Sequence, residues 1–503
     1  IPYDNFIKHP LEVKLIEVDT EQWLDRLKTS IKEEIYQPSP ITICEVPKGK
    51  GLIRPGGHLC INDRIVYTAC VGACFTHIYR HLDNARNIDY SYCFSKNPYQ
   101  EKWLSPAFNG WVKFREKSLE ILKEGYPYVI FVDIAAYYEN INILILMSDL
   151  VQIGCDKIVT KQLSSCLNRW AQVTGSGVPQ GYSPSNILAK LYLNSVDQKL
   201  RDFGYVHVRY VDDLRIFCHS KVEANRTLMD LIKLFRKRGL NVQSEKLKVF
   251  RFDKAKEKIQ GIEPIIRNAN EHIIREAMKI SGEDNPYFTI TKAEEIIPID
   301  IDNPSAEIIR DTFTAHFIDS DDFDKTLFRY LLKRLGKRKD DLALGYCKSA
   351  LINHAQETRY IIDYFGAIGA SGEMLIEISA FLYSEEAIYD YQKFLIYEWL
   401  LKNDFINDDF IIIARSLAFD NNLPIYLRCI CKIYLGKFGT FSDLEQLEDS
   451  YSTCTDTFEQ SVIICALTRI ESSRRNAFLS RVSGDGEMNK RAVDLVKSGK
   501  ALN

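Results

Sequence analysis

Three aspartates stand beside short apolar runs in the first half of this 503-residue chain. Asp133 ends the run YVIFVD (128–133), and the adjacent Asp212 and Asp213 interrupt the apolar stretch 205–218. Neighbouring carboxylates repel each other unless protons or cations neutralise them. If the fold brings all three together, they offer hard oxygen ligands for Mg²⁺ and for two-metal chemistry at a phosphate. Taken singly, Asp133 is better explained as a helix N-cap.

The hydrophobic pattern predicts the elements that would position these acids. Residues 128–134 have the length of a buried strand, and residues 205–218 form two apolar strands around a polar turn. The segment 177–191 is a Gly- and Pro-rich loop, with Gln180 and Gly181, that leads into an amphipathic helix. Residues 46–64 predict a β-hairpin with a cationic tip. These elements predict an α+β first half.

From about residue 270 the pattern changes to successive amphipathic helices, after connector-like segments at 282–288 and 298–307. Apolar clusters around Trp399, Ile430 and Ala466 recur at the spacing of helix-pair repeats, and a compact all-α domain is the alternative. The predicted helices span 325–335, 358–368, 389–402, 408–419, 424–436 and 457–470.

Charge is divided unevenly along the chain. Residues 1–270 hold 38 Lys+Arg and 30 Asp+Glu, whereas the remainder holds 27 and 38. A basic first half favours a polyanionic partner, although an acidic solvated helical face in the second half gives the same counts. The 13 cysteines predict reduced thiols in a cytoplasmic protein, and the apolar runs are too short to predict a membrane partner.

The order of these pieces resembles the palm of a reverse transcriptase over about residues 40–265. Finger-hairpin motifs of bacterial and group II intron enzymes are similar to PKGKGLIRP (47–55) with DRIV (63–66), and YSYCF (90–94) resembles a stretch just before their palm. The palm motifs A to D correspond, in order, to DIAAYY (133–138), PQG (179–181), YVDD (210–213) and Lys246. The chain departs from the family where PQG continues as YSPSN and where Leu247 follows the lysine.

The resemblance implies two-metal nucleotidyl transfer. Asp133 and Asp212 would be the main ligands of Mg²⁺, for which Mn²⁺ can substitute, and the backbone carbonyl of Ile134 would complete a site. Asp213 would support the pair electrostatically, and Lys246 would protonate the leaving pyrophosphate. An alternative for Lys246 is one more base in the basic run 246–258.

Other positions would contact the nucleotide. Tyr138, five residues after Asp133, would exclude a 2′-hydroxyl and so favour dNTPs, and Gln180 and Gly181 would line the nucleotide surface. The positively charged residues of the fingers hairpin would hold the triphosphate; they are Lys48, Lys50 and Arg54. Arg54 is the best candidate, because its guanidinium fork binds phosphate bidentately. The alternative is that all three are solvated charges on the hairpin.

A polymerase domain joined to a helical C-terminal domain resembles the bacterial abortive-infection and defence-associated reverse transcriptases of the AbiK kind. This implies fingers and an N-terminal region over 1–125, a palm with an antiparallel sheet and helices over 126–265, and an all-α, helical-repeat-like domain over 270–503. It also implies a homo-oligomer assembled through the helical domain, with dNTPs as substrates and DNA as product. Alternatives are copying of an associated non-coding RNA template, an inactive scaffold whose helices bind a partner, and a mobile-element enzyme.

Some relatives attach DNA to their own tyrosine, and the sequence offers candidates. Tyr36 precedes the proline-rich stretch QPSP, which predicts an exposed loop, and Tyr3 lies near the start of the chain. The alternative is a nucleic-acid primer. One apparent metal motif is rejected, because a single straight helix cannot wrap four ligands around zinc, and core packing is the better interpretation of Cys70, Cys74, His77 and His81.

Overall fold

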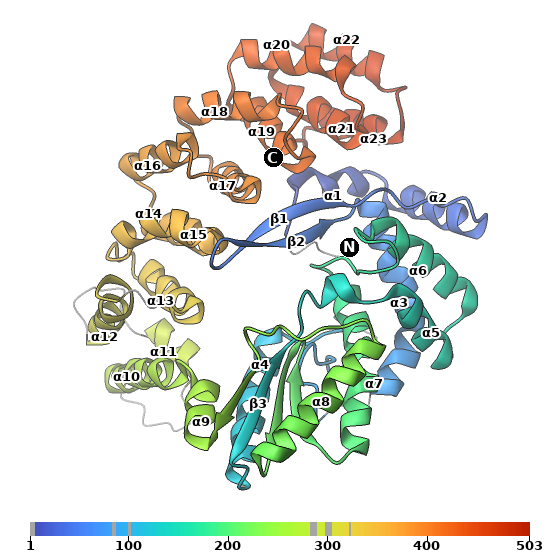
Figure 1. The fold of residues 1–503 in the computed structure, drawn as a ribbon. Helices are drawn as coiled ribbons and strands as arrows, with labels where there is room; N and C mark the ends of the chain where they lie inside the picture. The colour runs from blue at the N-terminus through green and yellow to red at the C-terminus, as the bar shows by residue number, and fades with distance from the viewer. Residues whose placement is uncertain are drawn as a thin grey trace. The chain divides into compact units, whose positions relative to one another are not determined.

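The computed structural model describes residues 6–82, 87–98, 102–281, 289–296, 304–320 and 323–502 (Figure 1). The connector segment 282–288, most of 298–307 and Tyr3 lie outside these residues. The chain divides into two compact units, and the segments of one unit alternate with those of the other along the sequence. The first unit comprises Ile1–Lys8, Leu24–Ile43 and Gly56–Gly261, and the second comprises His9–Trp23, Cys44–Pro55 and Ile262–Asn503.

The first unit is built on a four-stranded sheet in the order β4-β5-β3-β6. Strand β5 pairs antiparallel with both β3 and β4, and β3 pairs antiparallel with β6. The strands at 128–134 and within 205–218 are thus present as predicted. Their bounds are β3 Tyr128–Asp133, β4 Val206–Tyr210, β5 Asp213–Cys218 and β6 Lys248–Arg251.

Helices cover both faces of this sheet, because alternate strand residues point to opposite sides. Ile130 and Val132 of β3 pack into the larger core with α7 and α8, whereas Val129 packs with α4 and α9. Helix α2 (Thr20–Lys32) begins in the second unit and continues into the first. The other helices of the first unit are α3 Ile61–His81, α4 Ala107–Lys123, η2 Tyr138–Asn140, α5 Ile143–Gln152, α6 Lys157–Trp170, α7 Ser183–Asp202, α8 Lys221–Lys237 and α9 Phe252–Gln260.

The second unit is helical apart from part of a two-stranded hairpin, β1 (Thr42–Lys48) and β2 (Leu52–His58). All six helices predicted for the second half are present. The described helices are α1 Pro10–Glu17, α10 Glu263–Ser281, α11 Ile290–Ile296, α12 Pro304–Phe313, η3 Thr314–Ile318, α13 Lys325–Lys337, α14 Leu344–Asn353, η4 Ala355–Glu357, α15 Thr358–Ile368, α16 Gly372–Tyr383, α17 Asp390–Lys402, α18 Asp408–Ala418, α19 Ile425–Phe438, α20 Phe441–Ser450, η5 Tyr451–Thr453, α21 Thr457–Ala466, η6 Leu467–Arg469, α22 Ser472–Val482 and α23 Glu487–Lys497.

Helices α13, α15, α17, α19, α21 and α23 pack in succession, each against the next odd-numbered helix (Figure 1). Ion pairs reinforce three of these steps: Arg329 of α13 to Glu357 just before α15, Arg359 of α15 to Glu398 of α17, and Arg428 of α19 to Glu459 of α21. At the far end α1 packs against α23, and the Arg491 guanidinium lies over the Trp23 ring and donates to the Asp19 carbonyl. The N-terminal segment 9–23 therefore covers the last helix of the stack.

The close approach of α19 and α21 gives a stability prediction. A Cβ added at Gly436 would lie 2.6 Å from the carbonyl oxygen and Cβ of Ala466. We expect Gly436→Ala to lower the free energy of unfolding by about 1–3 kcal/mol, because the two helices must move apart. Chemical unfolding measures the loss. The matched control is Gly345→Ala in α14, where the added Cβ meets nothing within 4 Å, and an equal loss in both variants would contradict the packing argument.

All thirteen cysteines are free thiols, and ten of them are buried. Cys70 and Cys74 of α3 lie in the core, as predicted, but His77 is exposed, so core packing was the wrong interpretation for that residue. In the part of the chain described, no helix is both long and apolar enough to cross a membrane.

Candidate active site

The sheet brings the three aspartates to one edge. Asp133, the last residue of β3, is paired in register with Asp213, the first residue of β5. The turn between β4 and β5 consists of two residues, and Asp212 is the second of them. The sequence separation of about eighty residues is thus closed by one antiparallel pairing.

The carboxylates influence one another. Burial raises the pKa of Asp213 to about 6; the nearby Arg215 opposes this shift, and the negative charges of Asp212 and Asp133 add to it. A cation bound near the three carboxylates would reduce the repulsion between them.

Lys246 already supplies one cation. Its Nζ donates to Oδ2 of Asp133 at 2.5 Å, while the lysine side chain stays 55% exposed. Backbone bonds hold its segment at the end of β3: Gln243 N–H donates to the Asp133 carbonyl at 2.7 Å, and Ala135 N–H donates to the Asn241 carbonyl. An exposed ion pair of this kind is worth little, so Lys246 can exchange partners readily.

The donor chemistry fits Mg²⁺, which takes carboxylate, carbonyl and water oxygens. Ile134, whose carbonyl was predicted to complete a site, follows Asp133 directly and forms a bridge with Val242. Within the described residues, no group of three or more His, Cys, Asp or Glu side chains is arranged so that it could hold a metal ion. Asp133, Asp212 and the Ile134 carbonyl would therefore need water or phosphate oxygens beside them to bind Mg²⁺.

Tyr137 and Tyr138 follow a backbone reversal in which Ala136 has φ of +45°. The buried Tyr137 hydroxyl donates to the Ala189 carbonyl at 2.5 Å. The Tyr138 hydroxyl donates to Oδ1 of Asn186 at 2.8 Å and lies 3.2 Å from the Tyr92 hydroxyl. Burial raises the pKa of Tyr138, so the phenol stays neutral. Asn186 has no role in the sequence-based prediction, and its only signal is its place in the SPSN helix start.

The loop with Gln180 and Gly181 is tied to the same region. Gly177 N–H donates to the Ile141 carbonyl and Val178 N–H donates to the Tyr138 carbonyl, both at 2.9 Å. Gly181 has φ of +106°, which a side chain would strain. Gln180 and Gly181 are both half-buried. The loop thus starts beside Tyr138, as the predicted nucleotide surface requires.

The predicted triphosphate-binding cations lie on a different part of the fold. Lys48, Lys50 and Arg54 are exposed on the β1–β2 hairpin, and the segment Cys44–Pro55 belongs to the second unit. The pKa of Lys325 is lowered by partial burial and by the positive charges of Arg329 and Arg54. Arg54 therefore lies near other basic residues of that unit, Lys325 and Arg329. Their role in holding a triphosphate stays a prediction.

Tyr36 is not the exposed residue that its proline-rich surroundings predicted. Its ring packs against the larger core, and its hydroxyl donates to Oδ1 of Asp63. Burial and the Asp63 charge raise the pKa of Tyr36 well above its ordinary value. The prediction failed because the loop folds back on α3, where Asp63 also accepts from Ser39 N–H.

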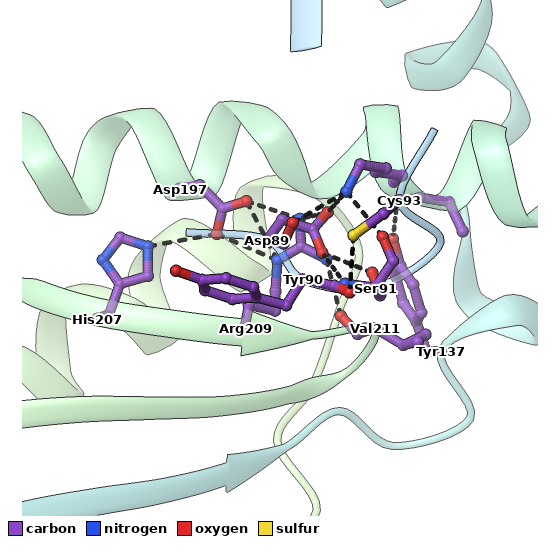
Figure 2. Close-up of polar contacts among 11 residues, drawn as sticks. Asp89, Tyr90, Ser91, Cys93, Tyr137, Asp197, His207, Arg209 and Val211 are labelled. Carbon is purple, nitrogen blue, oxygen red and sulfur yellow. Dashed lines mark hydrogen bonds and ion pairs between the residues drawn. The ribbon is translucent and has the colours of Figure 1, made fainter. Parts of the chain in front are cut away.

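A buried ion network beneath the β4–β5 turn was missed by sequence reasoning. Arg209 lies between Asp197 and Asp89, and His207 contacts the other side of Asp197 (Figure 2). Lys190 pairs with Asp89 at 2.8 Å. These side chains come from β4, α7 and the loop at 87–98, so their only sequence signal is charge inside apolar segments.

This network predicts an acid-sensitive loss of stability. Burial would raise the pKa of Asp197, but Arg209 and the bond from His207 outweigh it and lower that pKa to about 2. A carboxylate with a lowered pKa stabilises the fold above its unfolded value near 4 and loses this contribution as pH falls towards 2. We expect Asp197→Asn to lose about 3–5 kcal/mol at pH 7, because Arg209 is left incompletely paired.

Chemical unfolding between pH 7 and pH 3 measures this effect. The difference between the parent chain and Asp197→Asn should shrink as pH falls below about 4. A difference that is constant with pH would contradict the ionic role of Asp197. Asp202→Asn is the control, since Asp202 pairs with Lys199 on the exposed end of α7.

Residues 46–281, just under half of the chain, match the family described as reverse transcriptase (RNA-dependent DNA polymerase). No curated protein sequence matches the chain. The matched segment contains all three aspartates, the Gln180 loop and Lys246.

Solved structures give only distant likenesses. A truncated apo telomerase from Candida tropicalis aligns with 15% identity and a TM-score of 0.32, over 46% of this chain and 55% of that one. Telomerase from Candida tropicalis in complex with a TWJ fragment of telomeric RNA aligns with 13% identity and a TM-score of 0.33, over 75% and 68%. Human deoxyhypusine hydroxylase in complex with glycerol aligns with 15% identity and a TM-score of 0.18, over 47% and 99%.

This chain thus spans about half the length of the first of these structures, and such low scores carry no functional conclusion. The sequence match is the stronger finding, and it coincides with the antiparallel sheet that gathers the aspartates. Residues 46–281, which include this sheet, are thus similar in sequence to the reverse transcriptase family.

Proposed function

We propose that this protein is a DNA polymerase of the reverse-transcriptase type, which adds dNTPs by two-metal nucleotidyl transfer. The observation that carries the proposal is the register of β3 and β5, which sets Asp133 opposite Asp213 and beside Asp212 within the segment that matches the family. No separate metal cage is needed, because nucleotide phosphates supply the remaining oxygens.

The residues divide the work as follows. Asp133, Asp212 and the Ile134 carbonyl would hold the two Mg²⁺ ions, which when bound activate the attacking hydroxyl and neutralise the pyrophosphate. Asp213 adds negative charge behind them. Lys246 would leave Asp133 and give its proton to the departing pyrophosphate. The Tyr138 ring, fixed through Asn186, would fill the space that a 2′-hydroxyl needs.

The proposed architecture is fingers, palm and a helical-repeat C-terminal domain, with boundaries near residues 125 and 265–270. The succession of odd-numbered helices, linked by ion pairs at three of its five steps, supports the repeat interpretation. We further propose that this helical part carries the contacts of a homo-oligomer. Size measurement by light scattering tests this, and a monomer at all concentrations would contradict it.

Incorporation of each labelled dNTP with Mg²⁺ tests the polymerase itself. Three reactions are compared: protein alone, protein with a DNA primer on an RNA template, and protein with the primer only. Asp212→Ala is the negative control in each. Incorporation that requires the RNA template favours a templated enzyme, incorporation by protein alone favours template-independent synthesis, and no incorporation in any reaction would contradict the proposal.

Protein priming is a finer part of the proposal. Tyr36 would have to release its bond to Asp63 before its hydroxyl could attack a nucleotide. Denaturing electrophoresis with and without protease shows whether the product is attached to protein, and mass spectrometry identifies the residue. Product that migrates free of protein excludes priming, and attachment that persists in Tyr36→Phe assigns it to another residue.

The biological role that we propose is bacterial antiphage defence by abortive infection, in the cytoplasm. Its support is the union of this domain with a large helical part. Phage plating on bacteria that express the parent chain or Asp212→Ala tests it. Protection by both would favour the alternative of an inactive scaffold with a partner-binding helical domain, and protection by neither would contradict the defence role.

A further inference from the structure

The turn that carries Asp212 is held in an unfavourable backbone conformation. Val211, its first residue, has φ of +57°. A β-branched side chain rarely adopts this left-handed region, because its Cβ crowds the neighbouring carbonyl. Such a conformation persists only where the surrounding structure fixes it.

Arg209 is bonded directly to this turn. Its Nη1 donates to the Val211 carbonyl at 2.9 Å. Its Nε and Nη2 donate to the Asp197 carboxylate, and Nη2 also donates to Oδ2 of Asp89 at 2.8 Å (Figure 2). All three guanidinium nitrogens are therefore bonded, and the one that faces the turn cannot rotate away without breaking ion pairs.

Backbone bonds and ion pairs also connect the segments that surround Arg209. The loop at 87–98 is joined to β4 by two backbone bonds, from Arg209 N–H to the Ile88 carbonyl and from Tyr90 N–H to the Arg209 carbonyl. Lys190 pairs with Asp89 and donates to the Ser91 carbonyl at 2.9 Å. Two positive and two negative groups are buried together, and buried charges of this kind are tolerated only in a fully bonded arrangement.

We propose that Arg209 is a positioning residue for nucleotidyl transfer: it holds the Val211–Asp212 turn in its left-handed form, so that Asp212 faces Asp133 and Asp213. The inference rests on the proposed function, since it assigns Arg209 to the reaction of that same site. A merely structural Arg209 would contribute to stability without any dependence on the conformation of Val211.

A double-mutant cycle separates these roles. Arg209→Lys keeps a positive charge in the network but cannot bond the turn and both carboxylates at once. We expect its incorporation rate to fall about 10- to 100-fold with a raised Mg²⁺ requirement, because Asp212 is misplaced. Val211→Gly removes the backbone strain, since glycine adopts positive φ freely. Added to Arg209→Lys, it should restore at least about threefold of the lost rate.

The matched control is Arg238→Lys. Arg238 likewise bonds a carboxylate, that of Asp149, and a carbonyl, that of Tyr192, but it does not touch the turn. Arg238→Lys should keep the Mg²⁺ requirement of the parent chain. Adding Val211→Gly to Arg238→Lys should change the incorporation rate no more than Val211→Gly changes it in the parent chain. If Arg209→Lys does not fold, Asp197→Asn replaces it, because that change loosens the guanidinium and so weakens its hold on the Val211 carbonyl.

Each outcome decides the inference. Rescue by Val211→Gly in the Arg209→Lys background but not in the control supports it. Loss of rate without rescue, or the same loss in Arg238→Lys, overturns it. If the parent chain incorporates no dNTP, the proposed function fails and the reaction role of Arg209 fails with it. Chemical unfolding of the parent chain, Arg209→Lys, Val211→Gly and the double variant then still shows whether the effects of Arg209 and Val211 on the free energy of unfolding are coupled.

Discussion

Replacement of Asp212 by alanine should lower dNTP incorporation by about 1000-fold or more while the protein stays folded. The residue lies in a surface turn rather than in the core, so its loss removes charge without leaving a cavity. Loss of one metal ligand typically costs several kcal/mol of transition-state stabilisation, which corresponds to a rate change of this size. Single-nucleotide incorporation at saturating Mg²⁺ measures it.

Asp202→Ala is the matched control for this experiment. Asp202 is an exposed acid of the same unit, and it pairs with Lys199 at the end of α7, away from the sheet edge. Its variant should incorporate dNTPs at the parent rate. A normal rate for Asp212→Ala, with an unchanged unfolding midpoint in both variants, would refute the assignment of the active site.

Tyr138→Val should relax sugar selection. The change removes the ring and its bond to Asn186, and the space it leaves can hold a 2′-hydroxyl. We expect the efficiency of NTP use relative to dNTP use to rise about 10- to 100-fold, the range typical when a pocket stops excluding a small group. Competition between labelled NTP and dNTP on one primer measures the ratio.

Tyr138→Phe isolates the ring from its hydroxyl. It keeps the bulk that excludes the 2′-hydroxyl but loses the hydrogen bond to Asn186, so its selectivity should stay close to that of the parent chain. Equal ratios in the valine, phenylalanine and parent proteins would mean that Tyr138 is only a packing residue.

Much of the candidate site was predictable because its signals are local. The runs that end at Asp133 and surround Asp212 have strand length and apolar pattern, and they form β3, β4 and β5 near the predicted bounds. Lys246 lies beside Asp133 in the structure, as its place as motif D in the family resemblance suggested. For these residues, hydrophobic periodicity and motif order agree.

The rest depends on partners distant in sequence. Asp89 and Asp197 meet at Arg209 only because a loop and a helix close over β4 from opposite directions, and nothing near any of them indicates the other two. Tyr36 was misjudged for the same reason: its prolines correctly exclude a helix, but they do not reveal that its hydroxyl reaches Asp63. The hairpin segment Cys44–Pro55 likewise belongs to the second unit, where buried Cys44 interacts with Tyr426, almost four hundred residues away.

The chain crosses between the two units five times, at residues 8, 23, 43, 55 and 261. During synthesis, the segments His9–Trp23 and Cys44–Pro55 therefore leave the ribosome long before the helices that complete their packing exist. The first unit can close around its sheet early, whereas these two segments must wait for the last third of translation. A chain shortened at residue 270 would keep both segments without their partners. Nascent-chain proteolysis should consequently find them protected only after the C-terminal helices have emerged.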